Sequence, residues 1–298
     1  MRETVPNYYH KFQCIAQKCT HNCCIGWEID IDEDTMELYN NLNTPMGEKI
    51  RESIEGEIPH FILQEGERCP FLNDDGLCNI ICEYGEDALC DICYLHPRFK
   101  NFYFSFEETG LGLCCEEAAR IILSDEEKFS ICMPDDVLEE ERDFFVKRQE
   151  IFDILQNRNK SMGERFFELA NTFEVGLDFK LNELCELYLS LERLDDKWTN
   201  ELKLLKQHSF NKKIFDDIKL QIPFEQLAVY FIFRHLKMGD ILSAVKMTLV
   251  SCYFIGALFD CYMSSFGYIN NEKIIDIVRM YSAEMEYSDE NLQALMAV

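Results

Sequence analysis

The sequence is short of basic side chains. It holds 29 lysines and arginines against 55 aspartates and glutamates, which gives a formal net charge of -26 over 298 residues. Such a charge repels phosphate backbones and anionic lipid headgroups, so neither nucleic acid nor a membrane surface is expected as a partner. A basic protein, or a lysine side chain presented by one, suits this surface better, although acidity can also serve solubility alone.

Targeting segments and uninterrupted apolar spans are also missing. Residues 1–10 contain no apolar run that could form the core of a signal peptide. The most apolar stretch, residues 245–263, is broken by Lys246, Ser251 and Asp260, which predicts a core helix and not a transmembrane segment. A cytoplasmic protein is therefore expected.

Two common cofactor motifs do not occur. The Cys-x3-Cys-x2-Cys pattern of radical S-adenosylmethionine enzymes is missing, because Gly26 and Gly85 stand where its third cysteine would be. No Gly-x-Gly-x-x-Gly follows a predicted strand, and Gly110-Leu111-Gly112 alone is more typical of a turn. A Rossmann-type cofactor domain is therefore not expected.

Cysteine, by contrast, is abundant and clustered. Twelve of the 15 cysteines lie in the first 132 residues, and an odd total in a reducing compartment argues against a disulfide framework. The scattered Cys185, Cys252 and Cys261 are expected to pack as small hydrophobic side chains. The clustered thiols predict a metal site rich in sulfur ligands.

The stretch 78–97 holds the densest group. Cys78, Cys82, Cys90 and Cys93 follow one another at steps of four, eight and three residues, and neighbours at i+3 or i+4 share a helix face. A turn at 73–76 should bring Cys69 close to Cys78 across two short strands.

Three further local elements are expected in the first half of the chain. The aromatic run 102–106 predicts a strand. Residues 28–34 predict a short strand or extended segment, and Cys115 should precede a helix over 116–123.

The second half of the chain reads as a series of helices. Apolar residues recur there at steps of three and four, with breaks at residues such as Pro223, Gly239 and Gly267. Pro134-Asp135-Asp136 marks the predicted boundary. We therefore expect a mainly α fold, with a Cys-rich metal-binding module containing short strands or a hairpin over 1–133 and an α-helical bundle over 134–298. The expected helices are 138–157, 162–173, 181–194, 197–208, 224–236, 241–264, 273–287 and 289–297.

Many motifs of the first 125 residues, taken in order, resemble the flagellin lysine-N-methylase family, which shares its core with putative zinc- or iron-chelating Cys-cluster proteins. The resemblance rests on the series Tyr8-x5-Cys14-x4-Cys19-x3-Cys23-Cys24-x2-Trp27, Cys69-Pro70-Phe71-Leu72, Gly76-Leu77-Cys78-x3-Cys82, Leu89-Cys90-x2-Cys93-x3-Pro97-Arg98 and Cys115-x2-Ala118-Ala119-Arg120. Over the helical half only the general character is similar. The chain is shorter than typical members, so either the C-terminal part of the family is missing here or this branch does without it.

The resemblance implies a protein-lysine N-methyltransferase that moves methyl groups from S-adenosylmethionine to lysines of flagellin and carries an iron-sulfur cluster. Cys14 also matches the family pattern, whereas Cys114 and Cys132 do not. The implied metal ligands are Cys19, Cys23, Cys24, Cys69, Cys78, Cys82, Cys90, Cys93 and Cys115.

The residues themselves leave the metal and its role open. Sulfur-rich ligation suits a 4Fe-4S cluster or a zinc ion held by four thiolates, and the surplus of thiols allows two centres. A non-enzymatic, metal-stabilised module that binds a protein partner is the alternative function. The oligomeric state is not predicted.

Several side chains beside the cysteine motifs are candidates for other roles. Tyr8, Glu28 and Tyr94 are weak candidates for deprotonating the substrate lysine, with packing or solvation as the stronger interpretation. Trp27 could cover the cluster, and Arg98 could bind a carboxylate of the cofactor or pair with Glu116.

Overall fold

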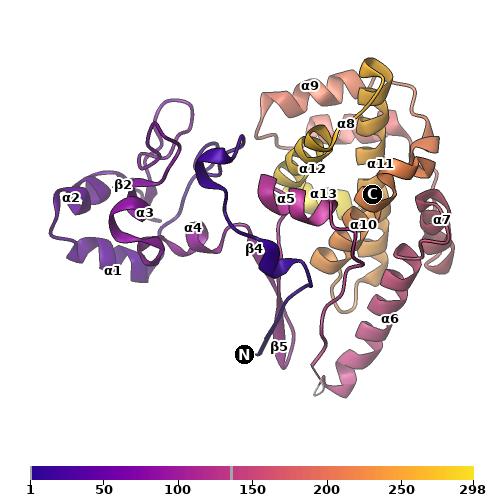
Figure 1. Cartoon of the computed structure of the whole chain (residues 1–298), viewed down its shortest axis with the longest axis horizontal. Helices are drawn as coiled ribbons and strands as arrows, with labels where there is room; N and C mark the ends of the chain where they lie inside the picture. Colours follow the sequence, from indigo (N-terminus) through magenta and orange to yellow (C-terminus); the bar gives the residue numbers. More distant parts are fainter. Residues whose placement is uncertain (1, 135–136) are drawn as a thin grey trace. The chain divides into compact units, whose positions relative to one another are not determined.

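The computed structural model describes residues 2–134 and 137–298, and the chain folds as two compact units (Figure 1). The larger unit consists of the residues up to Phe12 together with Phe99–Val298, and the smaller unit is Gln13–Arg98. Each unit has a hydrophobic core of its own. The fold is mainly helical, as the sequence predicts.

The larger unit is built from helices that follow the apolar periodicity. Each expected helix of the second half is present, with ends that differ by a few residues. Ser161 caps α7 in a capping box with Glu164, and Gly267 ends α11 in the left-handed conformation. The helices are α5 (Glu116–Leu123), α6 (Glu139–Leu155), α7 (Met162–Thr172), α8 (Leu181–Ser190), α9 (Asp196–Leu205), α10 (Gln221–His235), α11 (Ile241–Phe266), α12 (Asn271–Glu286) and α13 (Asp289–Met296), with 3-10 turns η1 (Tyr9–Lys11), η4 (Lys212–Asp216) and η5 (Ile218–Leu220).

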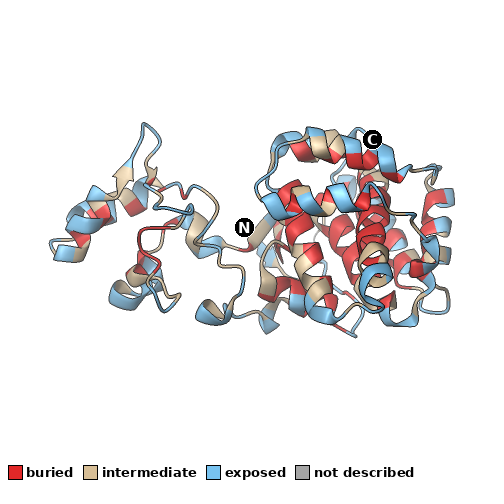
Figure 2. Cartoon of the chain, turned by 90° about the horizontal axis from the view of Figure 1, so that it is seen from above, coloured by how far each residue is buried: buried red, intermediate tan, exposed pale blue. Residues whose placement is uncertain are grey.

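Helix α11 forms the centre of the larger unit. It is long and apolar enough to cross a membrane by length and composition, yet 78% of its most apolar window is buried inside the protein. It packs against α10, and both helices are buried along most of their length. Figure 2 shows many buried residues among the helices of the larger unit. The prediction of a core helix over this stretch is confirmed.

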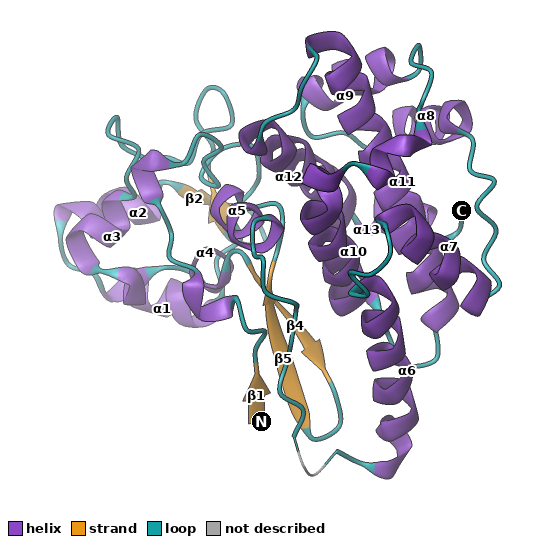
Figure 3. Ribbon diagram, turned by 45° about the vertical axis from the view of Figure 1, so that its right-hand side comes forward, coloured by secondary structure: helices purple, strands orange, loops and turns teal. Residues whose placement is uncertain are grey.

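A small sheet belongs to the larger unit. Its strand order is β1 (Arg2–Thr4), β5 (Phe106–Leu111), β4 (Arg98–Phe102), with β1 and β5 parallel (Figure 3). The prediction of one strand over 102–106 is wrong, because residues 103–105 form the turn between two strands. Tertiary packing determines where the aromatic side chains of this turn lie, since Tyr103 and Phe106 stack with their ring centroids 4.9 Å apart.

Gly110 also departs from its expected turn and lies in β5. A Cβ atom at this position would come within 2.3 Å of the Phe99 ring and 2.7 Å of the Phe233 ring. Glycine is required here because β5 passes directly against these two aromatic rings.

The smaller unit consists of short elements joined by loops. Its helices are α1 (Glu33–Asn41), α2 (Pro45–Glu52), α3 (Asn79–Tyr84) and α4 (Asp91–Leu95), its strands β2 (Ile54–Glu55) and β3 (His60–Phe61), and its 3-10 turns η2 (Ala16–Lys18) and η3 (Glu86–Ala88). Asp30 pairs with His60 in a single bridge, so residues 28–34 are extended only in part before α1 begins. Pro45 begins α2 at a position where its missing N–H is not needed.

The two units do not divide at the predicted boundary between 133 and 134. Strand β5 and helix α5 belong to the larger unit because Phe106, Leu111, Ala119 and Ile122 lie in its hydrophobic core. The composition change near Pro134 therefore falls inside that unit. Asp135 and Asp136, the rest of the predicted boundary motif, lie outside the described residues.

Candidate metal centre and a buried polar network

Two short helices of the smaller unit present pairs of thiols. Cys78 is the N-cap residue of α3 and Cys82 lies one turn further on, while Cys90 is the N-cap residue of α4 and Cys93 lies on its first turn. Each pair therefore shares one helix face, as the spacing predicts. Cys90 is buried, Cys78 and Cys93 are half-buried, and Cys82 is exposed.

Backbone pairing brings two further cysteines to this region. The Cys69 N–H donates to the Cys24 carbonyl at 2.9 Å. Leu72 pairs with Cys78 across the turn at 73–76, where Gly76 has a φ of +75°. The predicted turn at 73–76 is confirmed, but a single isolated bridge stands in place of the two short strands expected around it.

Adjacent thiols interact in pairs. A hydrogen bond from Cys24 lowers the pKa of Cys23, and the same bond, with burial, raises the pKa of Cys24. Cys90 and Cys93 behave alike: the hydrogen bond lowers the pKa of Cys90 and raises that of Cys93. In each pair, therefore, one thiol has a lowered pKa and its neighbour a raised one.

The pairs also influence one another. Burial raises the pKa of Cys69 to about 11, with further contributions from the charges of Cys78 and Cys90. Negative charge on Cys69 and Cys78 adds to the raised pKa of Cys24, and charge on Cys24 and Cys69 adds to that of Cys93. All five of these cysteines, Cys24, Cys69, Cys78, Cys90 and Cys93, lie in or pack against the small hydrophobic core of this unit.

These five cysteines do not form a closed ligand set. Among residues 2–134 and 137–298, no group of three or more His, Cys, Asp or Glu side chains is arranged to hold a metal ion. The donors still fit a thiolate-ligated centre in chemistry, since they are all sulfur and come from separate segments around one small core.

Asp32 fixes the helix that carries Cys90 and Cys93. Its carboxylate accepts from the Thr35 N–H at 2.9 Å, which caps α1, and from the Asp91 N–H at 2.8 Å in the first turn of α4. Burial alone would raise the pKa of Asp32, but these backbone N–H groups lower it overall. One charged cap thus holds two helix N-termini together.

The other candidate site residues of the smaller unit lie around the thiol region but do not form a single site. Trp27 donates from its indole to the Cys23 carbonyl, and its ring lies 6.0 Å from the His96 ring. Burial, followed by the charge of Arg98, lowers the pKa of His96 to about 4, so this imidazole is neutral near pH 7. Arg98 donates to the Tyr94 carbonyl at 3.4 Å.

The three weak catalytic candidates lie in unlike surroundings. Glu28 is exposed and 3.7 Å from His60, and Tyr94 is 53% exposed. Tyr8 belongs to the larger unit, where it is only 2% exposed and packs against Phe129. Its buried hydroxyl has no hydrogen-bond partner among the described residues. Packing is the role that these surroundings support for Tyr8.

The remaining predicted ligands are Cys19 and Cys115. Cys19 is half-buried in the smaller unit and donates to the His21 carbonyl at 3.1 Å. Cys115 belongs to the larger unit, where it is the N-cap residue of α5, as predicted. Cys185 and Cys252 are buried in the helical core, which confirms their expected packing role.

A buried polar network in the larger unit was not predicted. Glu286 at the end of α12 accepts from His235 at 2.5 Å and from the Tyr230 hydroxyl at 3.0 Å, and it pairs with Arg234 at 3.4 Å. Ser282 also donates to this carboxylate. Burial would raise the pKa of Glu286, but the positive charge of Arg234 and the bond from His235 lower it.

The network reaches the surface through Arg234. Its guanidinium lies 4.9 Å from the ring centroids of both Phe99 and Tyr287. Tyr287 is 48% exposed and hydrogen-bonds Cys114, whose pKa burial raises to about 12. In the sequence, the sign of this network is the pair Arg234-His235 at the end of an otherwise apolar helix. Its partner Glu286, 51 residues after His235, has no local sequence signature.

Comparisons with known proteins match the helical half of the chain. The FliB lysine N-methylase C-terminal domain matches residues 168–298, inside the larger unit. The chain therefore contains a segment similar to the family's C-terminal domain. The motif resemblance of the first 125 residues lies outside this match and stays a prediction.

Curated relatives agree with the family match. A lysine-N-methylase of Salmonella typhimurium is 28% identical over 138 residues, which cover 43% of this chain and 34% of that protein. The flagellar biosynthetic protein FliU of Salmonella muenchen is also 28% identical over 138 residues, covering 43% of this chain and 80% of FliU.

The match thus spans about a third of the lysine-N-methylase. No solved structure matches the chain. Residues 168–298 are thus similar to the C-terminal domain of the FliB lysine N-methylase family, a match that covers less than half of the chain.

Proposed function

We propose that this protein is a cytoplasmic protein-lysine N-methyltransferase that uses S-adenosylmethionine to methylate flagellin. The observation that supports this most directly is the similarity of residues 168–298 to the FliB lysine N-methylase C-terminal domain. The names of the curated relatives, a lysine-N-methylase and a flagellar biosynthetic protein, point to the same reaction and substrate class.

The reaction requires little covalent chemistry from the protein's own side chains. A neutral lysine amine attacks the sulfonium methyl, the new N–C bond forms as the S–C bond breaks, and one proton leaves the ammonium. The protein must align the two reactants and accept or release that proton. A net charge of -26 favours the approach of a lysine-bearing protein surface.

We further propose that the smaller unit carries a metal-thiolate centre, a 4Fe-4S cluster or, as the alternative, zinc. Cys24, Cys69, Cys78, Cys90 and Cys93 would hold it, because their charges influence one another. When bound, such a centre crosslinks the loops that carry these thiols and offers a metal to which the cofactor's amino-carboxylate can coordinate.

The remaining predicted residues take supporting roles in this proposal. Trp27 beside Cys23 would shield the centre from water, and Arg98 at the end of the smaller unit would bind the cofactor carboxylate. Cys19, Cys23 and Cys82 supply further thiols of the smaller unit for the same centre or a second one, whereas Cys115 lies in the larger unit.

The experiment is anaerobic purification of the full chain, analysis of iron, zinc and sulfide, and transfer of labelled methyl groups from S-adenosylmethionine to purified flagellin. We expect about four iron and four sulfide per chain, a visible charge-transfer band that changes on adding the cofactor, and label on flagellin lysines. Cys93→Ser should lose the metal, whereas Cys132→Ser, an exposed thiol outside the pattern, should keep it.

Two results would contradict the proposal separately. A colourless protein with zinc and no sulfide rules out the iron-sulfur centre. Metal-dependent folding without cofactor binding or methyl transfer rules out the enzyme and favours a metal-stabilised module that binds a protein partner.

A further inference from the structure

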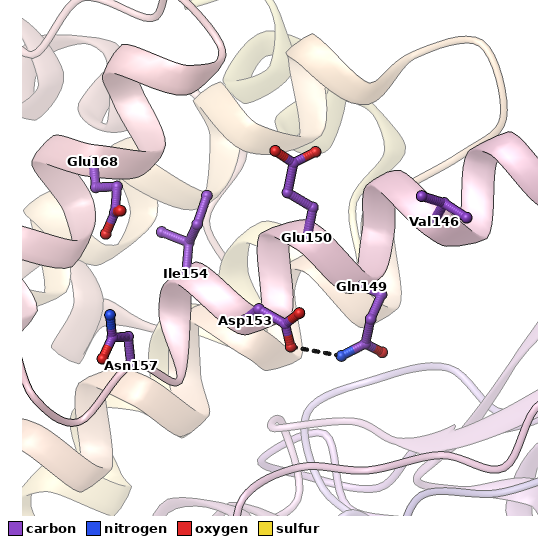
Figure 4. Close-up of a pocket in the computed structure, with 7 residues that line it drawn as sticks. All are labelled: Val146, Gln149, Glu150, Asp153, Ile154, Asn157 and Glu168. Atoms are coloured by element: carbon purple, nitrogen blue, oxygen red, sulfur yellow. Dashed lines mark hydrogen bonds between the residues drawn. The ribbon is translucent and has the colours of Figure 1, made fainter.

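A groove of about 580 Å3 lies between α6 and α7 of the larger unit (Figure 4). Most of its lining comes from α6, and α7 contributes Glu168 from the facing side. The lining residues are Val146, Gln149, Glu150, Asp153, Ile154, Asn157 and Glu168.

The α6 residues of this groove form one helical face. From Val146 to Ile154 their positions recur at steps of three, one, three and one, so they follow a single stripe along about two turns of α6, and Asn157 lies just beyond its end. Val146 is 67% exposed although it is aliphatic, and Ile154 adds a second apolar side chain that is half-buried against the core of the larger unit. These two side chains form the apolar strip of the groove.

Carboxylates flank this apolar strip. Glu168 is already paired with Lys160 at 2.9 Å. Asp153 accepts from the Gln149 amide at 2.9 Å, and neither Asp153 nor Glu150 has a cation partner among the described residues. Two negative charges beside these apolar side chains make a surface that complements an amphipathic segment with lysine or arginine on its polar edge.

We propose that this groove docks a lysine-bearing amphipathic helix of the protein substrate. The inference rests on the proposed function and adds to it a docking surface for the substrate outside the thiol region. Apolar side chains of the bound helix would contact Val146 and Ile154, and its lysines would pair with Glu150 and Asp153. A face of about two turns fits a partner helix of about nine residues, roughly 13 Å long.

The test uses the full chain and a synthetic helical peptide of about fourteen residues, with leucines along one face and lysines beside them. The double variant Glu150→Gln/Asp153→Asn removes both unpaired charges while keeping side-chain shape. The matched control is Glu140→Gln/Asp143→Asn, which removes two exposed charges from the same helix outside the groove. Fluorescence anisotropy gives the dissociation constants.

We expect the groove variant to bind the peptide about fivefold more weakly than the wild type and to show a smaller salt dependence, while the control stays within twofold. Val146→Ser should also weaken binding, since it removes apolar contact at a position that is 67% exposed. Equal loss in the control variant, or equal binding of a peptide with glutamates in place of the lysines, would overturn the proposal.

Methyl transfer to flagellin separates this inference from the proposed function. If both hold, the groove variant raises KM for flagellin and leaves kcat unchanged. If the chain transfers no methyl groups but peptide binding still depends on Glu150 and Asp153, the activity fails and the docking surface stands. If transfer proceeds with an unchanged KM in the groove variant, the docking surface is wrong and the activity stands.

Discussion

The single carboxylate of Glu286 joins three parts of the larger unit. It is buried, and its partners Tyr230, Arg234 and His235 come from α10. Tyr230 in turn accepts from the Leu113 N–H at 3.2 Å, just before α5. A charge that is buried with its partners is costly to remove alone, because the remaining charge is left unpaired.

Replacing Glu286 with glutamine should therefore destabilise the larger unit. Arg234 would stay buried without its counter-charge, at a cost of about 3 kcal/mol, which corresponds to a fall in melting temperature of about 10 °C. Glu272→Gln, an exposed position in the first turn of the same helix, should change the melting temperature by less than about 2 °C.

The same carboxylate predicts a pH dependence. The pKa of Glu286 is lower in the folded protein than in the unfolded chain. The stabilisation that its negative charge contributes is therefore complete above the unfolded pKa of about 4.3, and it is lost as pH falls through the folded pKa. The stability difference between wild type and Glu286→Gln should hold constant near neutral pH and shrink below about pH 4. A difference that grows in acid would show that Glu286 is not held ionised.

At the level of single residues, the sequence predicted the thiols but not their partners. The spacing of Cys90 and Cys93 showed that they share a helix face, and the structure pairs them. Glu286 gave no such signal, because an acidic residue near a helix end usually faces solvent. Its burial depends on Arg234 and His235, which only the packing of α12 against α10 brings near.

Among the elements, α1 and α4 depend on one shared cap. Asp32 accepts backbone N–H groups from both helices, at 2.9 Å from Thr35 and 2.8 Å from Asp91. Helix α4 has only five residues, which is too short to be stable by itself. Its position, and that of the two thiols it carries, therefore follows from this contact.

Replacing Asp32 with alanine should loosen α4 as well as α1. Loss of the cap should cost about 1–2 kcal/mol in the smaller unit and speed amide exchange in both helices. The matched control is Asp34→Ala, an exposed acidic residue in the first turn of α1. Faster exchange in α1 with no change in α4 would refute the shared role of this cap.

Long helices were predictable from sequence, whereas the strands were not. The apolar repeat of α11 is long enough to fix its type and place within two residues. The aromatic run at 102–106 has high strand propensity, yet Tyr103 lies in a turn because it bonds Glu108 and stacks on Phe106. Short elements follow such tertiary contacts more than their local propensity.

On the scale of the molecule, the two units differ in how they can be stabilised. The larger has an extensive core built from long helices. The smaller has short helices, two-residue strands and a core to which Cys69 and Cys90 themselves contribute. A unit of this size with so little regular structure generally needs a metal or another crosslink.

Removing the proposed metal should therefore unfold the smaller unit and spare the larger one. After treatment with a chelator, amide exchange followed by mass spectrometry should rise across Gln13–Arg98, while α10 and α11 keep their protection because their contacts involve no thiolate ligand. The Cys90→Ser variant should show the same pattern without chelator, and Cys252→Ala, which truncates a buried helical thiol, should weaken only the larger unit. Unchanged amide exchange in Gln13–Arg98 would mean that the small hydrophobic core of this unit keeps it folded without the metal. A rise in exchange spread evenly over both units would mean that the two units do not unfold independently.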